Sequence, residues 1–156
     1  MADSSIKAGI QFESYKLDRI DFSVTPQLAV LASTNQHDCG VDFSFAFRDV
    51  FKYKKQESVL YVTGLQVTLK VYDNETKNEL AKGVFSITGL FSSAKTLEQE
   101  TEKKLVKCQA PAILFPYIRA SITHILTDAG FSTITMPLVN VNAMANNCEI
   151  NIIQQP

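Results

Sequence analysis

Apolar and polar residues alternate over four stretches of the N-terminal part of the chain, with the period of two that is typical of a β-strand. The first stretch covers residues 10–24, reads as one strand or a pair of short strands, and ends where Pro26 would interrupt a sheet. The second covers residues 41–48, the third 58–72 and the fourth about 79–90. The pattern therefore predicts four consecutive strands, the last two of which are joined by a polar hairpin turn.

Three phenylalanines lie on one face of the second predicted strand. Phe43, Phe45 and Phe47 alternate with small or polar residues, and side chains two apart in a strand point to the same side. Each ring can bury ~150 Å² or more, which is a large apolar area for a short element. The phenylalanines therefore form either part of the core or a surface that binds apolar peptides, and the sequence leaves both interpretations open.

Helical periodicity begins in the second half of the chain. Residues 92–107 are the most charged stretch, and Thr96 and Gln99 have the spacing of a capping box, which predicts a short solvent-exposed helix. A longer helix is expected to begin near Pro116, because proline fits the first turn of a helix, and to end at Gly130. Its apolar stripe consists of Phe115, Ile118, Ile122, Ile125, Leu126 and Ala129.

The segment after the longer helix is predicted to turn back on it. Phe131 is expected to fold onto Leu126, as in a Schellman motif around the preceding glycine. Residues 132–139 are expected to be extended, and a short second helix capped by Asn140 or Asn142 follows them. The tail beyond this helix fits a strand or a coil equally well.

Length and composition favour one domain. The 156 residues are expected to divide into a sheet at about 10–90, a charged connector at 92–107 and a helical part at about 112–147. With 15 basic and 16 acidic residues, the chain has no overall field that attracts nucleic acid or an anionic membrane. Three widely spaced cysteines, no signal-peptide run and no apolar stretch of ~20 residues indicate a cytoplasmic protein that is not inserted in a membrane.

Residues that carry catalytic chemistry are scarce. The two histidines are His37 and His124, and only Cys39 lies near the first of them, whereas a structural zinc site needs four ligands. The chain has no Gly-x-Ser-x-Gly motif, no phosphate-binding glycine loop and no pair of carboxylates set in apolar sequence. We therefore expect no enzyme activity, no catalytic residue, no metal and no cofactor.

Two sequence runs give the chain a resemblance to a known family. Residues 83–89 read GVFSITG at the end of the fourth predicted strand, and residues 108–119 read CQAPAILFPYIR at the entry to the helix. The Gly-Phe pair at 130–131 and the run MPLVN at 136–140 match the helix end and the start of a second helix. From about residue 10 to residue 144, the chain resembles the SecB family of export chaperones.

The resemblance implies both a fold and a function. The fold is α+β, with a four-stranded antiparallel sheet followed by a long helix and a short second helix, assembled as a homotetramer that is a dimer of dimers. The function is that of a holdase, which uses no ATP, keeps unfolded or partly folded preproteins competent for export in apolar grooves, and delivers them to the motor protein SecA. Excess apolar surface without catalytic groups agrees with this role, because many weak contacts hold an extended chain.

The family pattern and the apolar helix also supply candidate site residues. The client-binding groove would be lined by Phe43, Phe45, Phe47, Met136, Leu138, Val139 and Met144. The candidates for docking on SecA are Asp18, Asp21, Glu79 and Leu80. The candidates for the oligomer interface are Ile118, Ile122 and Ile125. Arg19 and Ser23 flank the first strand's Ile-Asp-Phe where the family typically has acidic residues, which weakens the expectation of SecA docking.

Two alternative functions stay open. A SecB-like chaperone can be dedicated to one partner, such as an antitoxin, and the altered acidic flank favours this alternative. A hot-dog-like thioesterase or lipid-binding protein also packs a helix across a curved antiparallel sheet. It would need a carboxylate or histidine facing the start of the helix, and the sequence places none there.

Overall fold

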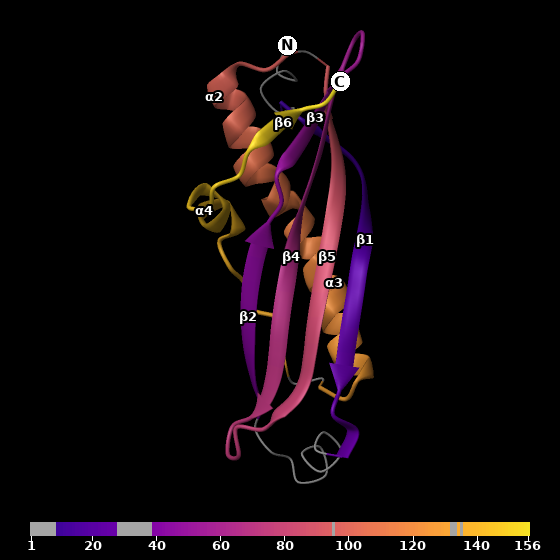
Figure 1. The fold of residues 1–156 in the computed structure, drawn as a ribbon, viewed down its shortest axis with the longest axis vertical. Helices are drawn as coiled ribbons and strands as arrows, with labels where there is room; N and C mark the ends of the chain where they lie inside the picture. Colours follow the sequence, from indigo (N-terminus) through magenta and orange to yellow (C-terminus); the bar gives the residue numbers. More distant parts are fainter. Residues whose placement is uncertain (1–8, 28–38, 95, 132–133, 135) are drawn as a thin grey trace, which may run out of the picture.

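Six strands form one sheet in the part of the chain that the structure describes (Figure 1). This computed structural model describes residues 9–27, 39–94, 96–131, 134 and 136–156. The strands are β1 (Gln11–Val24), β2 (Cys39–Phe47), β3 (Val50–Lys54), β4 (Val59–Asp73), β5 (Glu79–Ser93) and β6 (Ile152–Gln154). Their order is β1-β5-β4-β3-β6, and β2 also pairs with β4.

The predicted number of four strands is wrong, because β4 is long enough to pair with two strands along one side. β2 pairs with residues 65–73 of β4, and β3 pairs with residues 59–62, both antiparallel as expected. Between them the backbone N–H of Arg48 donates to the carbonyl oxygen of Gly64 at 3.0 Å. The sixth strand, β6, comes from the tail and pairs in parallel with β3.

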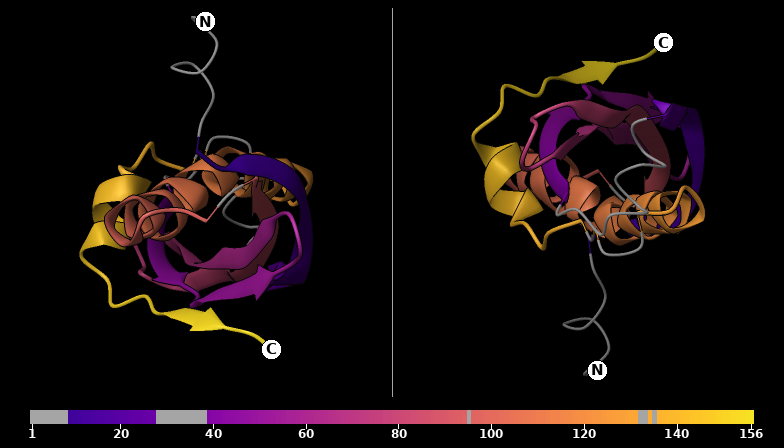
Figure 2. Two further views of the ribbon diagram at one scale, coloured as in Figure 1. Left: turned by 90° about the horizontal axis from the view of Figure 1, so that it is seen from above. Right: turned by 90° about the horizontal axis from the view of Figure 1, so that it is seen from below.

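One face of the sheet carries the core. The residues of β4 that are predicted to share a face are buried, from Val59 at one end to Val71 at the other. Their neighbours across β5, among them Phe85, Ile87 and Phe91, are buried as well. Seen from either end, the strands curve into a partial ring that the helices close (Figure 2). The core therefore lies between the curved sheet and the helices.

The long helix begins well before the predicted start at Pro116. Its three consecutive parts are α2 (Gln99–Glu102), η2 (Lys103–Gln109) and α3 (Ala110–Asp128). Much of the predicted charged connector therefore belongs to the helix. The N-cap residue is Glu98 and not Thr96, and its side chain makes no capping hydrogen bond, so the predicted capping box is not formed.

A π-helical segment, η2, explains how the helix passes its first proline. In a π-helix the backbone hydrogen bonds reach back five residues, as does the bond from the N–H of Ala110 to the carbonyl of Leu105. In a regular α-helix the proline ring collides with the carbonyl four residues before it. The wider turns of η2 end at Gln109, two residues before Pro111, and relieve that collision. The prediction that the long helix starts near Pro116 was therefore too late in the sequence, because it assumed that a proline marks the first turn of a helix.

The end of the long helix is confirmed as predicted. Gly130 has a φ of 94°. The N–H of Phe131 donates to the carbonyl of Leu126 at 2.7 Å, and the N–H of Gly130 donates to that of Thr127 at 3.0 Å. These two bonds define a Schellman motif, which needs a residue that tolerates positive φ at the glycine position.

The short second helix is also confirmed. α4 (Val141–Asn146) is capped by Asn140, whose side chain accepts a hydrogen bond from the N–H of Ala143 at 3.0 Å. On the long helix the predicted stripe is buried at Phe115, Ile118, Ile122 and Leu126, and half-buried at Ile125 and Ala129. Among the described residues, no helix has the length and apolar character needed to cross a membrane.

Candidate peptide-binding surface

The three phenylalanines of β2 form a half-buried apolar strip beside the helices. Their partners across β4 belong to the buried face, so the rings point to the side of the sheet that the helices cover. The ring of Phe45 lies 6.1 Å from that of Phe115 on α3. In the described residues β2 has a strand on one side only, which leaves its other edge open. We call Phe43, Phe45 and Phe47 the phenylalanine strip.

The connection between α3 and α4 is held against α3 on the same flank. Arg119 donates from Nε to the backbone oxygen of Met136 at 3.1 Å. Phe115 and Arg119 are four residues apart and therefore lie on one side of the helix. Val139, further along the connection, is half-buried and packs against the core. The phenylalanine strip and the connection thus approach the same flank of α3.

The other predicted groove residues differ in exposure. Met136 has no exposed surface, so it supports the connection from inside and is not available to a client. Val139 and Met144 are half-buried. Leu138 is 80 % exposed, which is the largest exposure among the large apolar side chains of the described residues. Apart from Met136, the structure leaves each predicted groove residue with surface that a peptide can reach.

The four candidates for docking on SecA do not form one acidic patch. The carboxylates of Asp18 and Asp21 are each paired with an arginine, at 2.7 and 3.6 Å. Glu79 is half-buried. Leu80 is 1 % exposed, close to the register shift between β4 and β5 at Tyr72. Leu80 therefore belongs to the core and cannot contact another protein in this conformation.

Two of the three oligomer candidates are also internal. Ile118 and Ile122 have no exposed surface within one chain, because they pack into the core beneath the helix. Ile125 is half-buried. The helix face that these residues occupy is therefore covered by the chain's own sheet, and a second copy would have to use another face.

Exposed apolar side chains gather along β1, which is the edge strand of the sheet. Tyr15 is 41 % exposed, Ile20 is 53 % exposed, and Tyr117 on α3 is 39 % exposed. The rings of Tyr15 and Tyr117 are 4.6 Å apart, and Phe12 lies 5.5 Å from Tyr117. We call Tyr15, Ile20 and Tyr117 the β1 edge patch. In the sequence, the one indication of this patch was Ile20, which lies on the apolar face of the first predicted strand.

A buried ionic contact fixes the beginning of the long helix. Nζ of Lys52 lies 2.5 Å from Oε2 of Glu102, and the hydroxyl of Tyr61 donates to the same oxygen at 2.7 Å. Burial, reinforced by the hydrogen bond to Glu102, raises the pKa of Tyr61. The sequence placed Glu102 in a solvent-exposed stretch, whereas the structure buries it between the helix and the sheet.

Comparisons with known proteins agree with this fold. The family model described as "SecB: Preprotein translocase subunit SecB" matches residues 50–149. No curated protein matches the chain. A solved structure of the Mycobacterium tuberculosis SecB-like chaperone Rv1957, in complex with a ChAD peptide from the antitoxin HigA1, aligns with a TM-score of 0.63. The alignment has 16 % sequence identity and covers 88 % of this chain and 95 % of the other. Since the family model spans well over half of the sequence, the chain belongs to the SecB family.

Proposed function

We propose that this protein is a molecular chaperone that needs no ATP and holds an unfolded or partly folded polypeptide against the phenylalanine strip. The observation that carries the proposal is a row of three aromatic rings, packed on the core yet partly exposed, beside an open strand edge. Such rings offer apolar contact to many sequences. The open edge of β2 adds backbone hydrogen bonds for an extended chain.

For the client, we favour a dedicated partner such as an antitoxin. The SecB-like chaperone with the same fold was solved with a peptide from an antitoxin. Docking on SecA has weaker support in this chain, because Asp18 and Asp21 face arginines and Leu80 is buried. The second candidate is a general holdase for preproteins that delivers them to SecA, supported by the family's description as a preprotein translocase subunit.

The thioesterase or lipid-binding alternative has little support in the site. It needs a free carboxylate or histidine facing the start of the helix. The buried carboxylate in that region belongs to Glu102, and both Lys52 and Tyr61 bind it. A turnover assay with acyl thioesters is the direct check, and robust hydrolysis would revive this alternative.

Suppression of aggregation tests the proposed chaperone function. Phe43→Asp introduces a charge into the phenylalanine strip, whereas Ser44→Asp introduces the same charge on the opposite, exposed face of β2. We expect the wild type and Ser44→Asp to keep a denatured client from scattering light after dilution. Phe43→Asp should lose most of this activity, because binding would bury an unpaired carboxylate. Circular dichroism checks that both variants are folded, and full activity of folded Phe43→Asp would contradict the proposal.

A further inference from the structure

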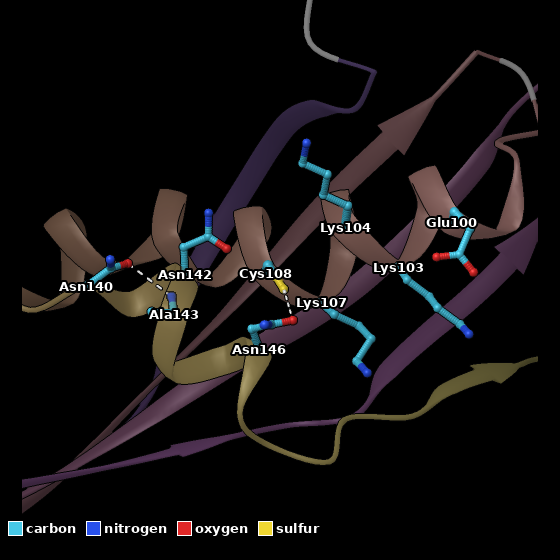
Figure 3. Close-up of a pocket in the computed structure, with 9 residues that line it drawn as sticks. All are labelled: Glu100, Lys103, Lys104, Lys107, Cys108, Asn140, Asn142, Ala143 and Asn146. Carbon is cyan, nitrogen blue, oxygen red and sulfur yellow. Dashed lines mark hydrogen bonds between the residues drawn. The ribbon is translucent and has the colours of Figure 1, made fainter.

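A cavity of about 520 Å³ opens between the long helix and α4, and none of the rings of the phenylalanine strip lines it (Figure 3). Its hydrogen-bond donors come from two elements. Lys103, Lys104 and Lys107 belong to η2, and Asn140, Asn142 and Asn146 belong to α4 and its cap. We call this cavity the lysine pocket.

The lysine pocket carries excess positive charge. Three lysines line it against one acidic residue, Glu100. In contrast to Lys52, none of the three lysines forms an ion pair within the described residues. Lys103 and Lys107 lie within one turn of each other on η2, and like charges this close repel each other. An anion in the pocket would relieve that repulsion.

The asparagines add further donors. Oδ1 of Asn140 accepts from the N–H of Ala143 at 3.0 Å, and Oδ1 of Asn146 accepts from Sγ of Cys108 at 3.9 Å (Figure 3). With their oxygens engaged, the two amides have NH₂ groups left for a ligand. Ammonium and amide donors together favour the oxygens of an anion such as a carboxylate.

The positive charges are spread along the helix and are not gathered at one point. Lys103 and Lys107 stand about one turn apart on η2. In Figure 3 both point toward the chain that leads to β6, whereas Lys104 points to the opposite side. Lys103 and Lys107 also line a second cavity of about 520 Å³ beside that chain. Several carboxylates along an extended peptide match this spread better than one small anion does.

The lysine pocket lies next to the predicted client surface. Met144 is part of α4 and Val139 precedes it, so one short helix borders both regions. α4 is about 9 Å long, and an extended chain passes that distance with roughly three residues. We propose that the lysine pocket binds Asp and Glu side chains next to the apolar segment of the client, so that the chaperone selects apolar segments with an acidic flank. This inference rests on the proposed function and specifies, in addition, the charge of the polypeptide that the chaperone binds.

Peptide binding tests the inference. Three labelled peptides share one apolar segment and carry a flank of glutamates, glutamines or lysines, and fluorescence anisotropy gives their affinities for the wild type. We expect the glutamate flank to bind about tenfold more tightly than the glutamine flank, since a few exposed ion pairs contribute that much together. The lysine flank should bind weakest. The differences should shrink at about 0.5 M salt, where exposed charges are screened.

Matched variants locate the effect. Lys103→Gln, Lys104→Gln and Lys107→Gln combined should remove the preference for glutamate and leave the affinity for the glutamine flank unchanged. The control combines Lys54→Gln, Lys70→Gln and Lys82→Gln, which are exposed lysines of the sheet, and it should keep the preference.

Each contrary outcome has its own meaning. Equal affinities of the wild type for the glutamate and glutamine flanks, or the same loss in the control variant, would overturn the acidic-flank inference alone. Displacement of the glutamate peptide by inorganic phosphate at a similar concentration would show a small-anion site and overturn the choice of a peptide. Failure of all three peptides to bind the wild type would overturn the proposed function, and this inference with it.

Discussion

At the scale of single residues, Glu102 joins three elements through one oxygen atom. Lys52 on β3 and Tyr61 on β4 both bind this oxygen, and Glu102 closes the first turn of the long helix. The side chain of Lys52 is 13 % exposed and that of Glu102 is 10 % exposed. A charge with so little access to water depends on its partner.

Replacing Glu102 by alanine is expected to lower the free energy of unfolding by about 3 kcal/mol, because Lys52 would keep a largely buried charge without a partner. Tyr61→Phe removes only the hydroxyl and should cost about 1 kcal/mol. Urea denaturation followed by circular dichroism measures both. Glu100→Ala, an exposed position on the same helix, is the control and should change little. A loss for Glu102→Ala no greater than the control's would contradict the role of the ionic contact.

At the scale of elements, the long helix has a strictly local stop signal. Gly130 has positive φ, and a Cβ added there would have no neighbour within 4 Å. A substitution at Gly130 therefore affects only the backbone conformation. This makes the position a clean test of the Schellman motif.

Gly130→Ala is expected to destabilise the protein by about 1 kcal/mol, because alanine disfavours positive φ. For a chain of this size that corresponds to a fall in the melting temperature of about 3 °C. Gly130→Asn should lose less, since asparagine tolerates this conformation better. Differential scanning calorimetry gives the order, and a melting temperature of Gly130→Ala at or above that of Gly130→Asn would contradict this explanation.

Local patterns were predictable from the sequence, whereas features that depend on distant partners were not. Alternation located β1, β2, β4 and β5, and the Schellman motif followed from a glycine and a phenylalanine. The strand β3 pairs with the part of β4 that β2 leaves free, and β6 pairs with β3. Alternation within one segment does not indicate which other segment it pairs with. The start of the long helix was misplaced because the π-helical turns before Pro111 give no periodic signal of their own.

The candidate site was predictable to a similar extent. The spacing of the phenylalanines was enough to place them on one face. The burial of Leu80 was not predictable, because it follows from the register shift between β4 and β5. The burial of Met136 was not predictable either, because it follows from the contact between Arg119 and the connection. The lysine pocket was missed because a charged run is usually a solvated face, and only the packing of α4 turns it into a cavity.

At the scale of the whole molecule, the edge strand β1 is the surface that we consider for contact with a second copy. In the described part of the chain β1 has a strand on one side only, Tyr15 and Ile20 are exposed on it, and Tyr117 of α3 lies against Tyr15. An open edge with apolar side chains favours pairing with another strand. We propose that dimers form through this edge and that the dimer of dimers builds on them.

Ile20→Asp should weaken this assembly, because it places a carboxylate in the proposed interface. Light scattering coupled to size exclusion measures the mass of the particle. Ile153→Asp changes another exposed isoleucine, on β6 at the far side of the sheet, and should leave the mass unchanged. A wild-type protein that is monomeric at micromolar concentration, or an unchanged mass for Ile20→Asp, would contradict the interface.

The parallel pairing of β6 with β3 has a consequence for biosynthesis. Asn151 donates its backbone N–H to Asp49 across a separation of 102 residues, and Val50 pairs with Ile152. While a ribosome is still translating the helices, the edge of β3 that pairs with β6 stays unpaired. Closing the loop between β3 and β6 is slow, because the two strands are far apart in the sequence. The chaperone thus passes through an interval in which its own nascent chain exposes a strand edge of the kind that chaperones protect.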